Sequence, residues 1–223
     1  MPNHCANSLV VTGPDAELRK FAKAAQGLKK DGQAFDLERF FPMPKELEGI
    51  HCGGATINGK SVTSWRKDAQ GNNIEIPEWE LKSMMKRFGA TNSYGWHCKV
   101  LGTKWGVYEV TSHYRAGILT YGFQSAWSPF NIGVFEKIVS LFPKLKFTMK
   151  FAEQGSGYYG FYGGAKGEVT GDGGWDTKDK LRQGKDGEEC YECGQTCGED
   201  CYGHWDLNLI GDQDFIDLLE CSG

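Results

Sequence analysis

Four cysteines lie within twelve residues and form a dense group of potential metal ligands. Thiolates are soft ligands that suit tetrahedral zinc, and the segment around them is charged and rich in glycine, with little apolar surface to bury. A bound metal would supply ordering energy that this segment lacks. We expect a structural zinc ion whose four thiolates leave no open position for catalysis, with free or locally paired thiols as the alternative. The predicted ligands are Cys190, Cys193, Cys197 and Cys201, with His204 in reserve.

Two histidine–cysteine pairs, His51-Cys52 and His97-Cys98, raise the question of a nucleophilic thiol. Adjacent residues on a strand point to opposite faces, so neither pair is a ready-made catalytic dyad. We interpret these cysteines as buried and inert. A cysteine activated by a distant histidine stays open, because catalytic groups assemble in space. The sequence contains no Gly-x-x-x-x-Gly-Lys phosphate loop, no His-Glu-x-x-His motif and no Gly-x-Ser-x-Gly turn.

Large aromatic side chains beside polar residues are candidates for ligand binding. Lys104 precedes Trp105, and Trp127 stands just before a predicted helix. A structural role competes in each case, because a tryptophan before a helix packs well and a lysine can lie over an aromatic ring. Residues 157–162, Gly-Tyr-Tyr-Gly-Phe-Tyr, faintly resemble the aromatic motif of RRM sheets, but lack its basic first residue and follow the fourth strand. The candidate binding residues are Lys104, Trp105, Trp127, Tyr158, Tyr159 and Tyr162.

The elements around these residues predict one elaborated α+β domain over residues 1–223. Apolar residues alternate with polar ones through residues 144–153, which is typical of a strand with one buried face. The predicted strands are residues 7–12, 105–111, 118–126 and 144–153. One helix is predicted after Pro14, and a second with Ser128 as N-cap and Pro129 in its first position. This β-α-β-β-α-β order is the ferredoxin-like arrangement, so we expect one antiparallel sheet with both helices on the same face.

Three further segments elaborate the predicted domain. Residues 43–95 are interpreted as a helical and loop insertion packed against the main sheet, in which the polar residues 53–73 form loops or a small hairpin. Within it, residues 77–88 are expected to form a helix with its buried stripe at Leu81, Met84, Met85 and Phe88. Residues 157–164 are predicted to add an edge strand, and residues 171–204 to form a charged, cysteine-rich excursion.

Three short strings in this order resemble a family of phage- and plasmid-borne proteins of unknown function that carry a YubB-like ferredoxin-like domain. The strings are Met1-Pro2-Asn3 with Cys5, Asn7 and Thr12-Gly13-Pro14; Gly102-Thr103-Lys104-Trp105; and Ala126-Trp127-Ser128-Pro129. The sequence departs from the family's pattern at His4, where an aromatic residue is commoner, and at Phe130, where a second proline is common. The resemblance implies a ferredoxin-like fold and residence on a mobile genetic element, and it implies no reaction.

Composition narrows the function classes. The chain carries 29 acidic and 25 basic residues, so we expect no measurable affinity for generic duplex DNA at physiological salt and regard nucleic acid as an improbable partner. No apolar run approaches the ~20 residues of a membrane span. Residues 1–5 lack the basic and apolar stretches of a secretory signal. We therefore expect a cytoplasmic protein of the bacterial host, without membrane partners and with reduced cysteines.

These observations favour a binding protein over an enzyme. Candidate aromatic residues are abundant, and no catalytic motif is assembled. With the resemblance to mobile-element proteins, the expected function is non-enzymatic interference with a host protein or ligand, in particular counter-defence. The alternative is a small enzyme or RNA-binding module whose site has no familiar motif.

Overall fold

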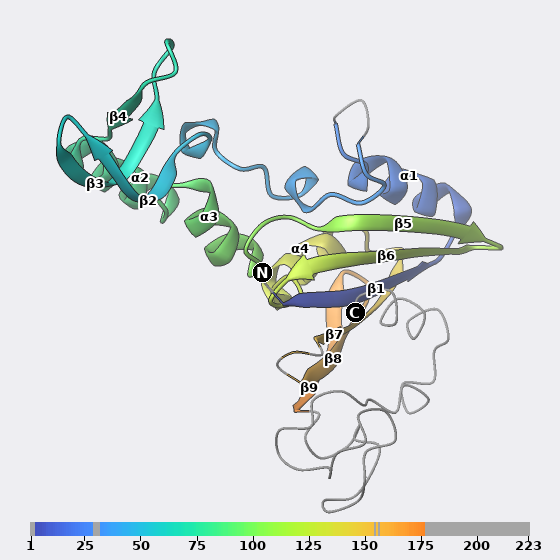
Figure 1. Ribbon diagram of the computed structural model, residues 1–223. Coiled ribbons are helices and arrows are strands. Elements are labelled where there is room, and N and C mark those ends of the chain that lie inside the picture. Colours follow the sequence, from blue (N-terminus) through green and yellow to red (C-terminus); the bar gives the residue numbers. More distant parts are fainter. Residues whose placement is uncertain (1–2, 29–31, 154, 156, 177–223) are drawn as a thin grey trace, which may run out of the picture.

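The main structural element is a six-stranded antiparallel sheet with strand order β5-β6-β1-β7-β8-β9 (Figure 1). It is seen in a computed structural model that describes residues 3–28, 32–153, 155 and 157–176. The strands are β1 (His4–Thr12), β5 (Tyr108–Arg115), β6 (Ile118–Ala126), β7 (Lys146–Glu153), β8 (Tyr158–Ala165) and β9 (Glu168–Asp176). Strands β1, β5, β6 and β7 have the strand order of a ferredoxin-like domain, which confirms the predicted α+β class and topology.

Side-chain alternation places the core on one face of this sheet. Leu9 of β1 is opposite Tyr121 of β6 and Met149 of β7, and all three are buried. On the other face, Lys150 and Thr148 of β7 are only partly buried. The predicted buried stripe of β7 is therefore confirmed, because a strand with period-two alternation must bury one set of side chains.

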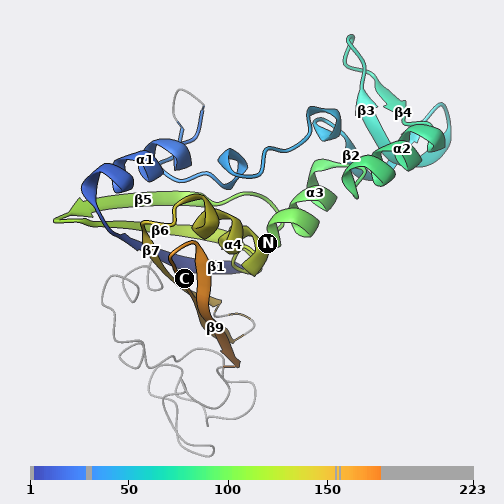
Figure 2. The ribbon, with the colours of Figure 1, turned by 180° about the vertical axis from the view of Figure 1, so that it is seen from behind.

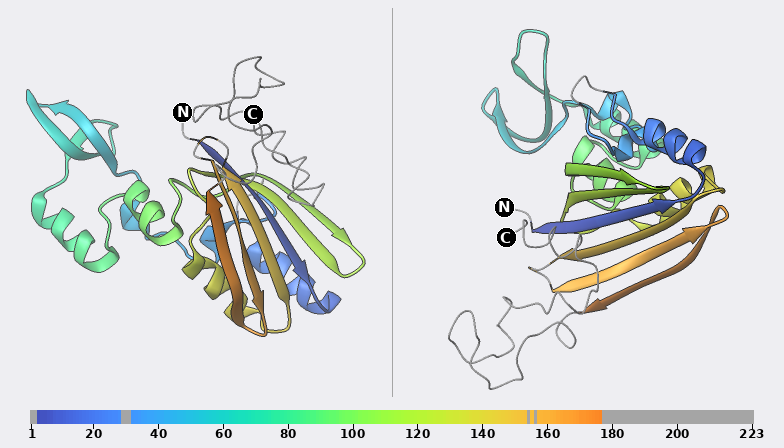
Figure 3. Two further views of the ribbon diagram at one scale, coloured as in Figure 1. Left: turned by 90° about the horizontal axis from the view of Figure 1, so that it is seen from below. Right: turned by 90° about the vertical axis from the view of Figure 1, so that its right-hand side faces the viewer.

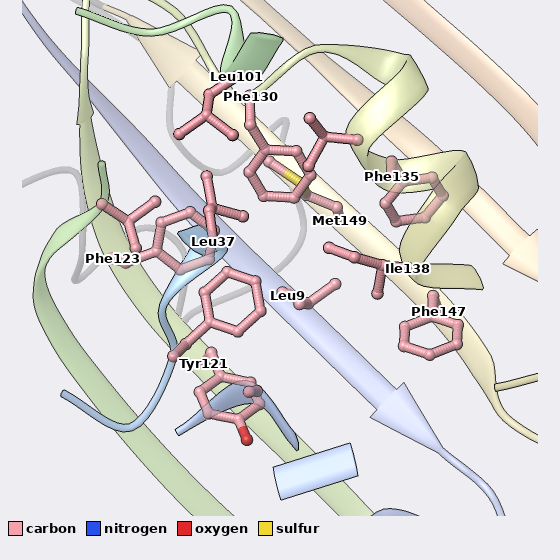
Figure 4. Packing of buried hydrophobic residues seen from close by; sticks show 14 of the residues in the cluster. Leu9, Leu37, Leu101, Tyr121, Phe123, Phe130, Phe135, Ile138, Phe147 and Met149 are labelled. Carbon is pink, nitrogen blue, oxygen red and sulfur yellow. The ribbon is translucent and has the colours of Figure 1, made fainter. Parts of the chain in front are cut away.

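Helices α1 (Asp15–Ala25) and α4 (Ile132–Leu141) both cover the core face, as Figure 3 shows. Phe21 of α1 packs edge-on against Tyr121 at 6.0 Å and Phe147 at 5.4 Å between ring centroids. Phe135 of α4 meets the same Phe147 ring at 6.4 Å. The aromatic core beneath the helices is drawn in Figure 4. The expectation that both helices lie on one face is confirmed.

The start of α4 differs from the prediction. The N-cap is Asn131, whose Oδ1 accepts a 3.0 Å hydrogen bond from the backbone N–H of Val134. Ser128 instead donates its hydroxyl hydrogen to the carbonyl of Gly102 at 2.7 Å. Both residues are good caps by type, so a tertiary hydrogen bond decides between them.

The insertion forms a small sheet of its own. Its strands and helices are β2 (His51–Ile57), β3 (Lys60–Lys67), β4 (Asn73–Glu75), α2 (Glu78–Phe88) and α3 (Ser93–Trp96). Figures 1 and 2 show β2–β4 and α2 projecting beyond one end of the main sheet, with α3 as the connection. The buried residues of this region, among them Ile50, Ile76 and Met84, join the apolar cluster of the main sheet, so the region packs at one end of that sheet (Figure 1). In α2, Met84 is buried as predicted, whereas Met85 is exposed.

The remaining helical segments are short and lie in the parts of the chain that connect the insertion to the core of the domain. They are the 3-10 turns η1 (Leu37–Arg39) and η2 (Lys45–Leu47) and the π-helical turn η3 (His97–Leu101). Leu37, Leu47 and Leu101 are fully buried and belong to the same apolar cluster as the sheet. The insertion is thus connected to the main core through a continuous apolar cluster.

Strand β8 is not an edge strand, because β9 pairs with it along its length. Residues 171–176, which the sequence assigned to the cysteine-rich excursion, belong to β9. Gly164 of β8 explains how α4 approaches so closely: a Cβ atom there would lie 2.5 Å from Cγ2 of Val139. Among the described residues, no helix is long and apolar enough to cross a membrane.

Candidate binding site

Lys104 lies between two tryptophan rings. Its Nζ is 4.8 Å from the ring centroid of Trp105 and 5.0 Å from that of Trp127. Both indoles remain about two-fifths exposed, at 39% and 41%. An ammonium group over the face of an indole is attracted by the ring quadrupole. The Lys104 ammonium group therefore attracts both rings and keeps them close together. The structure therefore brings together three of the six predicted binding residues.

Trp127 has a backbone conformation that tryptophan rarely adopts. Its φ is +73°, in the left-handed region that favours glycine. Two hydrogen bonds hold it: its N–H donates to the carbonyl of Asn3 at 2.9 Å, and its carbonyl accepts from the Tyr158 hydroxyl at 2.6 Å. Tyr158 is therefore a fourth predicted residue at the site, where it supports Trp127. Such strain persists only where neighbouring structure imposes it.

The two loops that carry the tryptophans are fastened to each other. The backbone N–H of Asn131 donates to the carbonyl of Leu101 at 2.8 Å, and its Nδ2 donates to that of Val100 at 2.8 Å. Gly102 has φ +82°, and a Cβ atom there would lie 2.9 Å from Cβ of Asn131. Glycine is therefore required for this approach, which sets Lys104 opposite Trp127.

A buried polar network fixes the same region from the β1 side. The Nδ2 group of Asn7 donates to the carbonyl of Cys5 at 2.7 Å and to Oγ of Ser125 at 2.9 Å. The Ser125 hydroxyl in turn donates to the carbonyl of Ser128 at 2.7 Å. Asn3, Cys5 and Asn7 of the first resemblance string therefore lie near the second and third strings, whereas Thr12, Gly13 and Pro14 lie at the other end of β1. Buried polar groups that are bonded in this way define a single local arrangement.

Two tyrosines that the sequence did not single out extend the surface. Tyr94 of α3 meets Trp127 edge-on at 6.2 Å, and Tyr108 of β5 lies 6.4 Å from Trp105. Burial, and secondarily the Glu109 carboxylate, raises the pKa of Tyr108 to about 12, so its hydroxyl is protonated and lies 2.6 Å from Nδ1 of His4. No spacing pattern links these tyrosines to the tryptophans. We call Tyr94, Lys104, Trp105, Tyr108 and Trp127 the aromatic patch.

A cleft of ≈420 Å³ opens beside the aromatic patch. It lies between the segment after α1 and the segment that enters β5. Its lining residues are Gly27, Gly32, Gln33, Asp36, Glu38, Trp105, Gly106, Val107 and Tyr108. Trp105 and Tyr108 therefore belong to both the patch and the cleft.

The other predicted binding residues lie elsewhere. Tyr162 faces the core, where its ring centroid is 5.4 Å from that of Phe135 and 5.0 Å from that of Phe151. Tyr159, on the opposite face of β8, is paired with Ala152 of β7. Neither residue contributes to the patch.

In each histidine–cysteine pair, the histidine ring contacts a residue outside the pair. The ring of His51 stacks on Trp65 at 4.1 Å, and Nε2 of His97 lies 3.0 Å from Oε1 of Glu38. Cys52 is exposed and Cys98 half-buried, so the expectation that both are buried is wrong. Cys98 lies in a helical turn rather than on a strand, which removes the strand argument for that pair.

Cys5 is the buried thiol of the described chain. Burial raises its pKa to about 12, so it is a neutral packing group and not a nucleophile at ordinary pH. In the part of the chain that the structure describes, no group of three or more histidine, cysteine, aspartate or glutamate residues could hold a metal. The predicted zinc ligands Cys190, Cys193, Cys197 and Cys201 lie outside the described residues.

Comparisons with known proteins point to a fold. No curated protein matches the chain. The crystal structure of a protein api92 from Yersinia pseudotuberculosis is similar at 11% sequence identity and a TM-score of 0.47, over 78% of this chain and 98% of that one. Residues 104–194 match the family model described as "Ferredoxin-like domain in Api92-like protein". This match begins at Lys104, includes Trp105 and Trp127, and assigns that part of the chain to a ferredoxin-like domain.

Proposed function

We propose that this protein is a non-enzymatic binding protein that engages a host protein through the aromatic patch. The observation that carries the proposal is Trp127, a large side chain held outward on a strained backbone and stacked with Lys104. Burial of an exposed indole in an interface removes a large apolar surface from water and so contributes strongly to binding free energy. Tryptophan is also enriched among the residues that dominate interface energies. A strained residue at such a position is a reasonable sign of a binding role.

We further propose that the protein belongs to a mobile genetic element and acts in counter-defence within the host cytoplasm. The resemblance of the three strings to phage- and plasmid-borne proteins supports this, and Asn3, Gly102 and Ser128 from those strings lie close to Trp127. Interference by binding requires a recognition surface and no reaction. The aromatic patch supplies such a surface, whereas the nearby thiol of Cys5 is buried and neutral.

The test is affinity capture from host lysate with quantitative mass spectrometry. We expect a stoichiometric host protein whose capture falls by about thirty-fold for Trp127→Ala, the effect of losing a residue that dominates an interface. Trp79→Ala is the matched control, because Trp79 is 72% exposed on α2 in the projecting unit. Equal capture by both variants, or capture of no stoichiometric partner, would count against the proposal.

RNA binding is the second candidate. Tyr159 and Phe161 alternate with the core-facing Tyr162, so they lie on the sheet face opposite the helices, the face with which RRM sheets stack bases. Lys150 of β7 pairs with Phe161 there. The central strand β1 contributes Ser8 and Val10 to this face rather than aromatic rings. We therefore rank RNA second to a protein partner. Phe161→Ala would weaken RNA binding and leave capture of a protein partner unchanged.

A further inference from the structure

Two hydrogen bonds join the walls of the cleft beside Trp105. The N–H of Gly27 donates to the carbonyl of Gln33 at 3.0 Å, and Nε2 of Gln33 donates to the carbonyl of Val107 at 3.0 Å. These bonds fasten the segment after α1 to the segment that enters β5. The cleft is therefore a built feature, and its ≈420 Å³ is enough for one extended side chain or a small ligand.

The carboxylate of Asp36 is the main charged group of the cleft. Its Oδ1 accepts a 2.9 Å hydrogen bond from the backbone N–H of Glu38, which caps η1. Its Oδ2 lies beside Gly27, where a Cβ atom would come within 3.3 Å of that oxygen. Gly27 therefore packs closely against this carboxylate oxygen, and any side chain there would crowd it.

The lining has the chemistry of a cation site. Two carboxylates, Asp36 and Glu38, line the cleft together with the rings of Trp105 and Tyr108, and none of the described residues that line it is basic. Oε1 of Glu38 is 3.0 Å from Nε2 of His97, so Asp36 is the carboxylate more available to a ligand. Carboxylates pair with alkylammonium and guanidinium groups, and aromatic faces attract the same cations. The Trp105 ring already attracts the ammonium of Lys104.

We propose that this cleft binds one alkylammonium or guanidinium cation, and that its source is a lysine or arginine side chain of the partner that docks on the aromatic patch. This assignment of the source rests on the proposed function, because Trp105 and Tyr108 are shared by the two sites. A free polyamine has the same chemistry and is distinguished by the test.

The test uses the full chain and NMR detection of the Trp105 indole N–H. The probes are Nα-acetyl-arginine amide and Nα-acetyl-lysine amide, with the uncharged citrulline amide for comparison. We expect saturable shifts with both cations and none with citrulline amide. Asp36→Asn keeps an oxygen that can cap η1 and removes the charge, so it should weaken cation binding by about ten-fold, the effect of losing a charged hydrogen bond.

Two further variants separate the site from general charge and from folding. Glu136→Gln removes one negative charge from the exposed surface of α4 and should leave binding unchanged. Gly27→Ala retains both carboxylates and places a methyl group beside Asp36 Oδ2, so it should also weaken binding. Equal shifts with arginine and citrulline amides, or unchanged binding by Asp36→Asn, would overturn the proposed site. Spermidine binding far more tightly than either amide would assign the site to a free polyamine and overturn the partner as source.

The two proposals fail in different ways. If Trp127→Ala abolishes partner capture while Asp36→Asn changes neither capture nor amide binding, the cleft proposal fails and the binding function stands. If arginine amide binds in an Asp36-dependent manner while no partner is captured, the cation site stands and both its assigned source and the proposed function fail.

Discussion

The hydroxyl of Tyr158 donates a 2.6 Å hydrogen bond to the backbone carbonyl of Trp127, and so connects β8 to the loop before α4. The N–H of the same tryptophan is bonded to Asn3, just before β1. Trp127, a strained and partly exposed residue, is thus held on one side by a strand of the core sheet and on the other by the residue that precedes β1. The position of the Trp127 indole depends on contacts far away in sequence.

Replacement of Tyr158 by phenylalanine is expected to cost about 1 kcal/mol of unfolding free energy, because it removes one hydrogen bond and leaves a carbonyl without its partner. It should also move the NMR signal of the Trp127 indole N–H. Urea unfolding and NMR provide the two readouts. Tyr114→Phe is the control, since the Tyr114 hydroxyl bonds to Asp15 at 2.6 Å on an exposed surface and should affect neither Trp127 nor stability to the same extent.

The backbone of Trp127 predicts an unusual order of stabilities. At φ +73° glycine is unstrained and alanine is not, so Trp127→Gly should unfold with a free energy up to about 1 kcal/mol above that of Trp127→Ala. Both variants lose the patch and should lose partner capture. At Trp105, whose φ is not positive, the order should reverse because alanine loses less chain entropy on folding. The same order at both positions would contradict the strain argument.

Local sequence patterns predicted those parts of the fold that one-sided burial determines. Phe147 and Met149 alternate with polar residues, so β7 could be placed from its pattern alone. For the small sheet the sequence predicted only loops or a small hairpin, because most residues of β2 are exposed and its sequence shows no alternation. Strand β5 begins at Tyr108 rather than at Trp105, because the chain bends through residues 102–105, which carry Lys104.

The candidate site was predicted only in part, for a related reason. Lys104, Trp105 and Trp127 stand out by residue type, yet their stacking depends on hydrogen bonds between loops about 25 residues apart. Tyr94 and Tyr108 have no local signature, and only the fold brings them to the patch. Tyr162 has the same residue type as Tyr158, but its place further along β8 puts it beneath α4.

The packing of α4 on β8 gives a prediction about glycine. Gly164→Ala would bring a methyl group within 2.5 Å of Val139 Cγ2 and 3.2 Å of Phe135 Cε1. Overpacking of this kind is expected to cost about 1–3 kcal/mol, measured by urea unfolding. Gly54→Ala in β2 is the matched control, because its Cβ atom would meet nothing within 4 Å and its φ is not positive. Equal stability of the two variants would show that α4 does not pack this closely.

The cysteine cluster predicts a bound metal. We expect close to one zinc ion per chain in protein purified without chelator, because four soft ligands lie in a segment too polar to order itself by apolar burial. Inductively coupled plasma mass spectrometry measures the content, and Cys193→Ser should lower it. Cys52→Ser is the control, since Cys52 is an exposed thiol of the projecting sheet. Metal-free protein with unchanged stability after Cys193→Ser would exclude a structural zinc site.

Stability at alkaline pH should depend on Cys5. Burial raises the pKa of its thiol from 9.0 to about 12, so the unfolded chain loses this proton at a lower pH than the folded chain does. The contribution is therefore fully present below pH 9.0 and is lost as the pH rises toward the folded value, at up to about 1.4 kcal/mol per pH unit. Tyr121, whose pKa burial raises from 10.0 to about 12, adds to the loss of unfolding free energy at higher pH.

Urea unfolding between about pH 8 and about pH 10 should show a steeper decline of the unfolding free energy for the wild type than for Cys5→Ala. The stability of Cys5→Ala is lower at neutral pH because the buried sulfur is missing. Parallel declines in the two proteins would mean that the Cys5 thiol ionises alike in the folded and unfolded states.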